Sequence, residues 1–117
     1  MSLFAGKMMP GMPTRSDVDV VSMPFSGTKP KPGDVVKLTA DGKVEVTTTD
    51  SDRAYGVVAV YDNKNVCAVV TKGHVLTNLT NPTVGTMAHV SLAVVRKMDA
   101  VDAQGALSQN AYEVKVG

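Results

Sequence analysis

Residues 35–48 read VVKLTADGKVEVTT, and this stretch decides the fold class. Two runs rich in valine and threonine stand on either side of Asp41-Gly42. The second run alternates apolar and polar residues, which is typical of a strand with one buried face. An Asp-Gly pair between such runs is a strong signal for a two-residue hairpin turn. The stretch therefore predicts two antiparallel strands over 35–39 and 44–48.

The same composition extends through the chain and predicts an all-β protein. The 117 residues include 21 valines and 11 threonines, but only two glutamates and no tryptophan. β-Branched side chains suit a pleated surface, and the 3.6-residue periodicity of amphipathic helices is missing. Further strands are expected over 54–61, 66–71, 74–79 and 112–116, with Gly56 marking a bulge or a close backbone approach. Lys72-Gly73 and residues 98–107 read as turns, and 87–95 as a strand or a strand that runs into a helical turn.

Seven to nine short strands at regular spacing favour a small β-barrel or β-sandwich. The length is that of one domain. A formal charge of +1 and an aromatic content of 4% argue against a nucleic-acid binder. No apolar run is long enough for a transmembrane helix. The first residues lack the pattern of a secretory signal, so synthesis in the cytoplasm is expected.

The first 33 residues differ from the rest, because they hold five of the seven methionines and five of the six prolines. Proline and glycine oppose regular structure there, except for one possible short strand over 17–22. We expect an extended arm over 1–30 and a compact β domain over 31–117. The arm is apolar for irregular chain, which favours an arm that orders against a partner over a freely solvated tail. Its candidate contact residues are Leu3, Phe4, Met8, Met9, Met12 and Phe25.

Few residues are candidates for catalysis or metal binding. Cys67, His74 and His89 match no closed zinc pattern, and a thiol in an apolar strand is inert as a nucleophile. Asp50 and Asp52 share a loop but lack further oxygen ligands for a cation. The other polar candidates are read as structural: Glu45 and Glu113 as solvated strand residues, and Lys29-Pro30-Lys31 as a hinge between arm and domain. We expect no catalytic residue, metal or cofactor.

Four segments together suggest a family. In order along the chain they are Gly33-Asp34-Val35-Val36-Lys37-Leu38, Asp41-Gly42-Lys43-Val44, Ala54-Tyr55-Gly56-Val57-Val58 and Val69-Val70-Thr71-Lys72-Gly73. This progression resembles the capsid decoration (cement) proteins of tailed bacteriophages, and the layout is similar to that of the lambda-type head decoration proteins. The resemblance covers about residues 31–75. Its turn and strand positions in this chain are Gly33, Asp34, Asp41, Gly42, Gly56 and Gly73.

The resemblance implies a structural protein of the virion, made in the host cytoplasm, that binds the outside of a capsid shell and stabilises it. Its partners would be the major capsid protein and further copies of itself, as dimers or trimers, with no nucleic acid and no membrane. Three alternatives stay open. They are another β-rich virion component such as a head fibre base or tail part, a small β-barrel module for a ligand or nucleic acid, and an enzyme.

Overall fold

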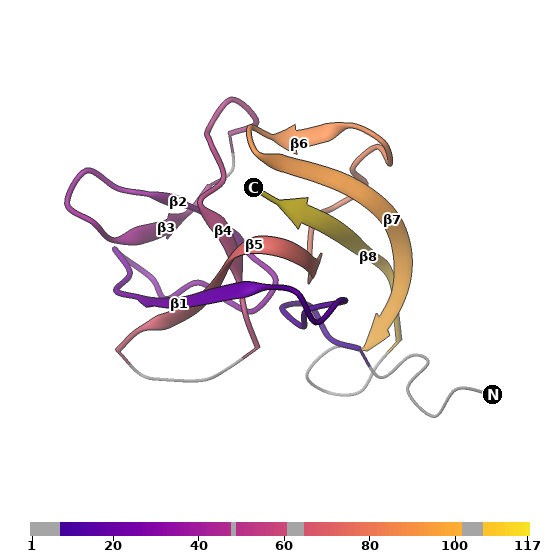
Figure 1. The fold of residues 1–117 in the computed structure, drawn as a ribbon, viewed down its shortest axis with the longest axis horizontal. Coiled ribbons are helices and arrows are strands. Elements are labelled where there is room, and N and C mark those ends of the chain that lie inside the picture. The colour runs from indigo at the N-terminus through magenta and orange to yellow at the C-terminus, as the bar shows by residue number, and fades with distance from the viewer. Residues whose placement is uncertain (1–7, 48, 61–64, 102–106) are drawn as a thin grey trace.

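The structure is a computed structural model that describes residues 8–47, 49–60, 65–101 and 107–117, without the side chains of 101 and 107–110. In these ranges the chain forms eight β-strands and no helix (Figure 1), so none of this part is a helix that could cross a membrane. The strands are β1 (Asp19–Met23), β2 (Val35–Leu38), β3 (Val44–Val46), β4 (Gly56–Val58), β5 (Cys67–Thr77), β6 (Met87–His89), β7 (Leu92–Val101) and β8 (Leu107–Val116).

The strands form one curled antiparallel sheet, a half-barrel, which confirms the predicted all-β class. The strand order is β3-β2-β4-β5-β8-β7-β6, and β1 pairs with β5 off this path. Figure 1 shows β1 to β4 on one side of the molecule and β6 to β8 on the other, with β5 belonging to both.

Strand β5 joins the two halves, and Gly73 lies where it passes from one to the other. Its first part pairs with β4 and β1, and its second part, from Gly73 to Thr77, pairs with β8. Gly73 has φ of +109°, and a Cβ at this position would lie 2.6 Å from the carbonyl oxygen of Asp17. The prediction of a turn at Lys72-Gly73 is therefore wrong. The glycine lets one continuous strand change direction and partners.

The predicted hairpin forms between β2 and β3, although its loop is longer than expected. Leu38 and Val44 are the last paired residues. The Gly42 amide donates to the Thr39 carbonyl (3.1 Å), and Gly42 has φ of +80°. The Thr39 amide in turn donates to the Lys43 carbonyl (2.7 Å). This is a turn followed by a left-handed glycine, the usual geometry of a three-residue hairpin loop.

The second half of the chain departs most from the expected strands. The segment 98–107, read as a turn, belongs at both its ends to the long strands β7 and β8. The segment 87–95 divides into β6 and the start of β7 at Val90-Ser91, where Ser91 has φ of +68°. The polar start of β8 is extended because β7 supplies its pairing partner, so tertiary pairing outweighs local composition.

The described residues of the expected arm pack against the β domain and form backbone hydrogen bonds with it. The predicted short strand is present as β1, which pairs with β5. Beyond it, Phe25 forms a parallel bridge with Val44 of β3, so this segment connects the β1 side of the sheet to its β3 end. The candidate arm residues Leu3 and Phe4 lie outside the described residues.

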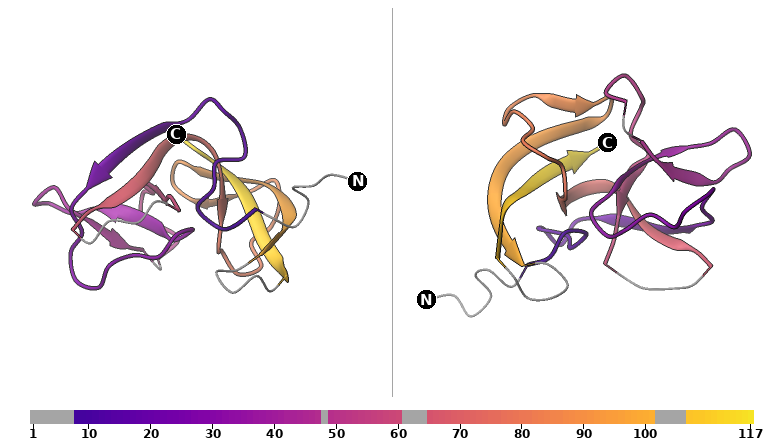
Figure 2. Two further views of the ribbon diagram at one scale, coloured as in Figure 1. Left: turned by 90° about the horizontal axis from the view of Figure 1, so that it is seen from below. Right: turned by 180° about the vertical axis from the view of Figure 1, so that it is seen from behind.

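The core consists mainly of valines, packed on both faces of β5. Val70 belongs to the larger cluster, which includes Val57, Leu92 and Val114. Its neighbour Val69 belongs to a second cluster with Val36 and Cys67. Figure 2 shows the sheet wrapping around these two interiors, with β1 running beside β5 on the outside.

Candidate interaction surfaces

The segment that begins at Met8 is held to β5 by backbone hydrogen bonds. The Gly11 amide donates to the Leu76 carbonyl (2.7 Å), and the Leu76 amide donates to the Met12 carbonyl (3.0 Å). The Thr14 amide donates to the His74 carbonyl (3.1 Å), and Pro13 forms a bridge with Val75. This part of the chain is therefore added to the sheet alongside β5.

A buried carboxylate fastens the end of the same segment. The Glu113 side chain is fully buried in β8 and accepts a hydrogen bond from the Thr14 hydroxyl. Its oxygens also lie 2.6 Å from Nε of Arg96 and 3.6 Å from Nε of Arg15. Burial acts to raise the pKa of Glu113, but the hydrogen bonds and the two arginine charges outweigh it and hold the pKa below its ordinary value.

The expectation that Glu113 faces solvent is thus wrong, because a segment 99 residues away covers it. Glu45, read in the same way, is partly exposed and lies 3.6 Å from Nζ of Lys37.

The described arm candidates are half-buried against the protein's own domain. Met8 packs against the small cluster of Leu76, Ala100 and Ala111. Phe25 packs against the second cluster, which contains Val44. The Met9 amide lies 3.2 Å from Sδ of Met12, and both residues are half-buried. Met8 and Phe25 thus pack against the domain, so any contact of their buried parts with another protein requires these residues to leave their clusters.

The positions that carry the resemblance lie in turns or in close strand contacts. Gly33, with φ of +90°, lies in a Lys31–Asp34 turn closed by the Asp34 amide and the Lys31 carbonyl (3.0 Å). The Asp34 carboxylate accepts from the Lys31 amide (2.8 Å) and from the side-chain amide of Asn78 (2.5 Å). Lys29-Pro30-Lys31 leads into this turn, with Pro30 buried.

Asp41 and Gly56 also have structural contacts. The Asp41 carboxylate accepts from the Thr39 hydroxyl (2.5 Å) within the hairpin loop. That hydrogen bond lowers the pKa of Asp41. A Cβ on Gly56 would lie 2.3 Å from the Val70 carbonyl oxygen, which accounts for the glycine expected from the sequence to mark a close approach.

The three residues considered for metal or nucleophile chemistry have different surroundings. Cys67 is buried, and burial raises the pKa of its thiol, partly opposed by the charge of Lys29. His89 is buried with Nδ1 3.1 Å from the Thr49 carbonyl oxygen, whereas His74 lies on β5. Within the described ranges no group of three His, Cys, Asp or Glu side chains is placed to hold a metal ion.

Of the two loop aspartates, Asp52 accepts from the Thr47 hydroxyl (2.7 Å) and pairs with Lys37 (3.2 Å). These contacts lower the pKa of Asp52, with the Thr47 hydrogen bond as the largest cause. Asp50 is exposed.

Besides Leu38 and Val46 on the paired strands β2 and β3, which are exposed by 49% and 42%, two further exposed apolar surfaces stand out. The first, which we call the β6 patch, consists of Val84, Met87 and Val90 at one end of the sheet, with exposed fractions of 49%, 59% and 46%. The second is β1, where Val20 and Val21 are exposed by 41% and 37%. Sequence reasoning missed both, because an exposed valine and a buried valine have the same local pattern.

A groove of about 390 Å³ lies between the start of β4 and the C-terminal end of β8, lined by Leu38, Arg53, Tyr55, Thr71 and Ser91 among others. Its lining joins a guanidinium and hydroxyl groups with apolar side chains. The arrangement offers a shallow binding surface without a cluster of titratable groups.

Comparison of the chain with protein-family models, with curated proteins and with solved structures found no match.

Proposed function

We propose that the protein is a capsid decoration protein that binds the outside of a bacteriophage shell and stabilises it. The resemblance over residues 31–75 supports this function. The positions in that region that carry the resemblance lie in turns and close strand contacts. Gly33 is an example of a turn position, and Gly56 of a close strand contact. A resemblance at such positions concerns the architecture of a small β body, which is what a cement protein presents to a shell.

The observation that carries the proposal is the exposed β6 patch. Val84, Met87 and Val90 come from one seven-residue stretch at the end of the sheet opposite β3. Strand β6 pairs with β7 along one edge, and large exposed apolar side chains in one short segment at a sheet end are a feature of surfaces that contact other proteins. Met8 of the expected arm, in contrast, packs against the cluster of Leu76, Ala100 and Ala111. We therefore propose the β6 patch as the shell-binding surface.

The test is co-sedimentation of the purified full chain with empty expanded shells of the phage that encodes it. We expect saturable pelleting at a fixed ratio to the shell protein, and weaker pelleting for Met87→Asp and Val90→Asp. Val46→Asp on β3 is the matched control, since Val46 is exposed to a similar extent (42%). No pelleting of the parent chain would contradict the decoration role, and equal losses for all three variants would contradict the β6 patch.

A further inference from the structure

The groove between the start of β4 and the C-terminal end of β8 has a strained backbone position in its wall. Val90 and Ser91 connect β6 to β7, and Ser91 has φ of +68°. This left-handed conformation at the third residue of a tight turn favours glycine or asparagine, because the Cβ of other residues is crowded there. Strained residues of this kind cluster at functional sites. Here the serine lines the groove.

Two other parts of the sheet hold this turn in place. The Ala54 amide, just before β4, donates to the Val90 carbonyl (2.9 Å). The Gly117 amide, just after β8, donates to the Ser91 carbonyl (3.0 Å). The position of the Ser91 side chain is therefore fixed through the backbone. In the part of the chain that the structure describes, its hydroxyl has no hydrogen-bond partner in the protein.

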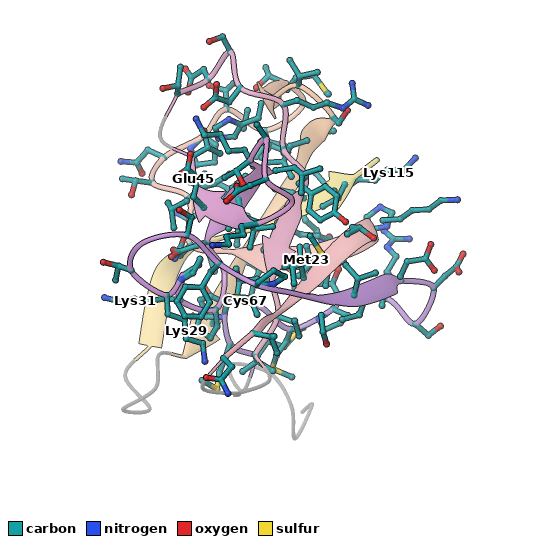
Figure 3. The ribbon with its side chains drawn as sticks, turned by 90° about the vertical axis from the view of Figure 1, so that its left-hand side faces the viewer. Met23, Lys29, Lys31, Glu45, Cys67 and Lys115 are labelled. Atoms are coloured by element: carbon teal, nitrogen blue, oxygen red, sulfur yellow. The ribbon has the colours of Figure 1, made fainter. Side chains whose placement is uncertain are left out.

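A rigid apolar wall stands beside this turn. Tyr55 packs against the second core cluster, and its hydroxyl lies 3.9 Å from Sδ of Met23. Met23 lies at the end of β1 beside its register partner Cys67 on β5 (Figure 3). Tyr55 is thus anchored to the interior on one side and lines the groove, together with Leu38 and Val116.

The groove also contains unmatched hydrogen-bond donors. Of its described lining residues, Arg53 is the one with a charged side chain. Neither this guanidinium nor the Thr71 hydroxyl has a hydrogen-bond or ion-pair partner among the described residues. A guanidinium offers donors alone, and a serine or threonine hydroxyl offers a donor as well as acceptors. The groove therefore combines one positive charge and two free hydroxyls with apolar surface.

The charged residues next in sequence to the lining have contacts elsewhere. Asp52, beside Arg53, pairs with Lys37 (3.2 Å). Lys72 and Lys115 line a different cavity, which Asp19, the register partner of Lys72, also lines. Successive side chains of a strand point to opposite faces, which separates these lysines from the groove residues beside them. The charge that the groove presents to a ligand is thus that of the guanidinium.

We propose that this groove binds a small monocarboxylic acid with an apolar body. The carboxylate lies at Arg53 and the hydroxyls of Thr71 and Ser91, and the body lies against Leu38 and Tyr55. A guanidinium fork matches the two oxygens of a carboxylate. Its single charge suits a monoanion better than a phosphate monoester, which carries about −1.5 to −2 at neutral pH.

The size of the groove fits such a ligand. Its volume of about 390 Å³ falls near the lower end of small-molecule sites, which span about 300–1,000 Å³. The inference does not depend on the proposed binding to a capsid shell, because the ligand is a small molecule and the shell is not needed to test it.

The first experiment is titration of the 15N-labelled full chain with benzoate, at constant pH and ionic strength, followed by amide chemical shifts. We expect saturable shifts at Ala54, Thr71 and Ser91. Benzamide has the same body without the charge, and acetate has the charge without the body. Each should bind about tenfold more weakly or worse. Absence of saturable shifts with benzoate would overturn the proposal, as would equal affinity for either of the other two compounds.

Variants test the assigned residues. Arg53→Gln should raise the dissociation constant for benzoate about tenfold or more, because it removes hydrogen bonds to a charged group. Lys97→Gln makes the same change of charge at an exposed position on β7 outside the groove, and should bind as the parent does. Parent-like binding by Arg53→Gln would contradict the proposal, as would equal losses in the two variants.

Ser91→Gly separates binding from folding. Glycine adopts positive φ readily, so the midpoint of thermal unfolding should stay the same or rise. The variant nevertheless lacks the hydroxyl, so we expect its affinity for benzoate to fall severalfold. A Ser91→Gly protein that binds benzoate as tightly as the parent would remove Ser91 from the site and overturn the inference drawn from its backbone.

Discussion

Nε of Arg96 lies 2.6 Å from Oε1 of Glu113, although the Glu113 side chain is fully buried and the Arg96 side chain is more than half exposed. The same carboxylate accepts from Thr14 and lies near Arg15, so one acidic group links β7, β8 and the N-terminal segment. We expect Glu113→Gln to lower the free energy of unfolding by about 2 kcal/mol, since it removes hydrogen bonds to a charged group. Denaturant unfolding measures this. Glu45→Gln, at a partly exposed position, is the control and should change stability by less than about 0.5 kcal/mol.

The lowered pKa of Glu113 predicts a dependence of stability on acid. A carboxyl whose folded pKa is depressed contributes stability that is fully present above its unfolded pKa, and this contribution is lost as the pH falls through the folded pKa. The parent should therefore lose more stability than Glu113→Gln between pH 6 and pH 2. Asp41 and Asp52 also have lowered pKa values, but they remain in both proteins and cancel in the difference. Parallel stability curves for the two proteins would contradict the assigned role of Glu113.

The bonds from Gly11, Met12 and Thr14 to β5 predict that the N-terminal segment stabilises the domain. Deletion of residues 1–15 removes these bonds, the packing of Met8 and two of the Glu113 contacts. We expect the midpoint of thermal unfolding to fall by roughly 10 °C or more, which corresponds to a few kcal/mol in a domain of this size. Deletion of residues 1–7 alone is the control. If both deletion variants have the same midpoint of thermal unfolding as the parent, the segment contributes nothing to stability.

The sequence was sufficient for the fold class and for the local features around residues 35–46. There the hairpin signal and the strands are contiguous in the chain, and the structure has β2 and β3 where the pattern predicts them. The continuous course of β5 through Gly73 could not be predicted. The position requires glycine because Asp17 and Val18, from another segment, approach it too closely for a Cβ. A Lys-Gly pair reads as a turn when that approach is unknown.

The candidate surfaces were less accessible to sequence reasoning. Glu113 alternates with valines as a solvated residue would, and its burial depends on Thr14 and Arg15 at the other end of the chain. The N-terminal methionines suggested an arm that binds a partner. Their adaptable side chains fit a partner or the protein's own sheet equally well. No local pattern shows that Pro13 pairs with Val75 of β5 or that Met8 packs on the domain, because both contacts are long-range.

Gly56 gives the sharpest test of the packing between β4 and β5. A Cβ at this position would lie 2.3 Å from the Val70 carbonyl oxygen and 2.5 Å from Cγ1 of Val69, closer than any side chain can be accommodated without moving the backbone. We expect Gly56→Val to cost about 3 kcal/mol or more, because overpacking against backbone cannot be relieved by a change of rotamer. Gly27→Ala is the matched control. Its Cβ would meet nothing within 4 Å, so only its φ of +75° opposes the substitution, at about 1 kcal/mol. Thermal unfolding of both variants measures the difference, and a Gly56→Val protein as stable as Gly27→Ala would mean that β4 and β5 are not in the close contact described.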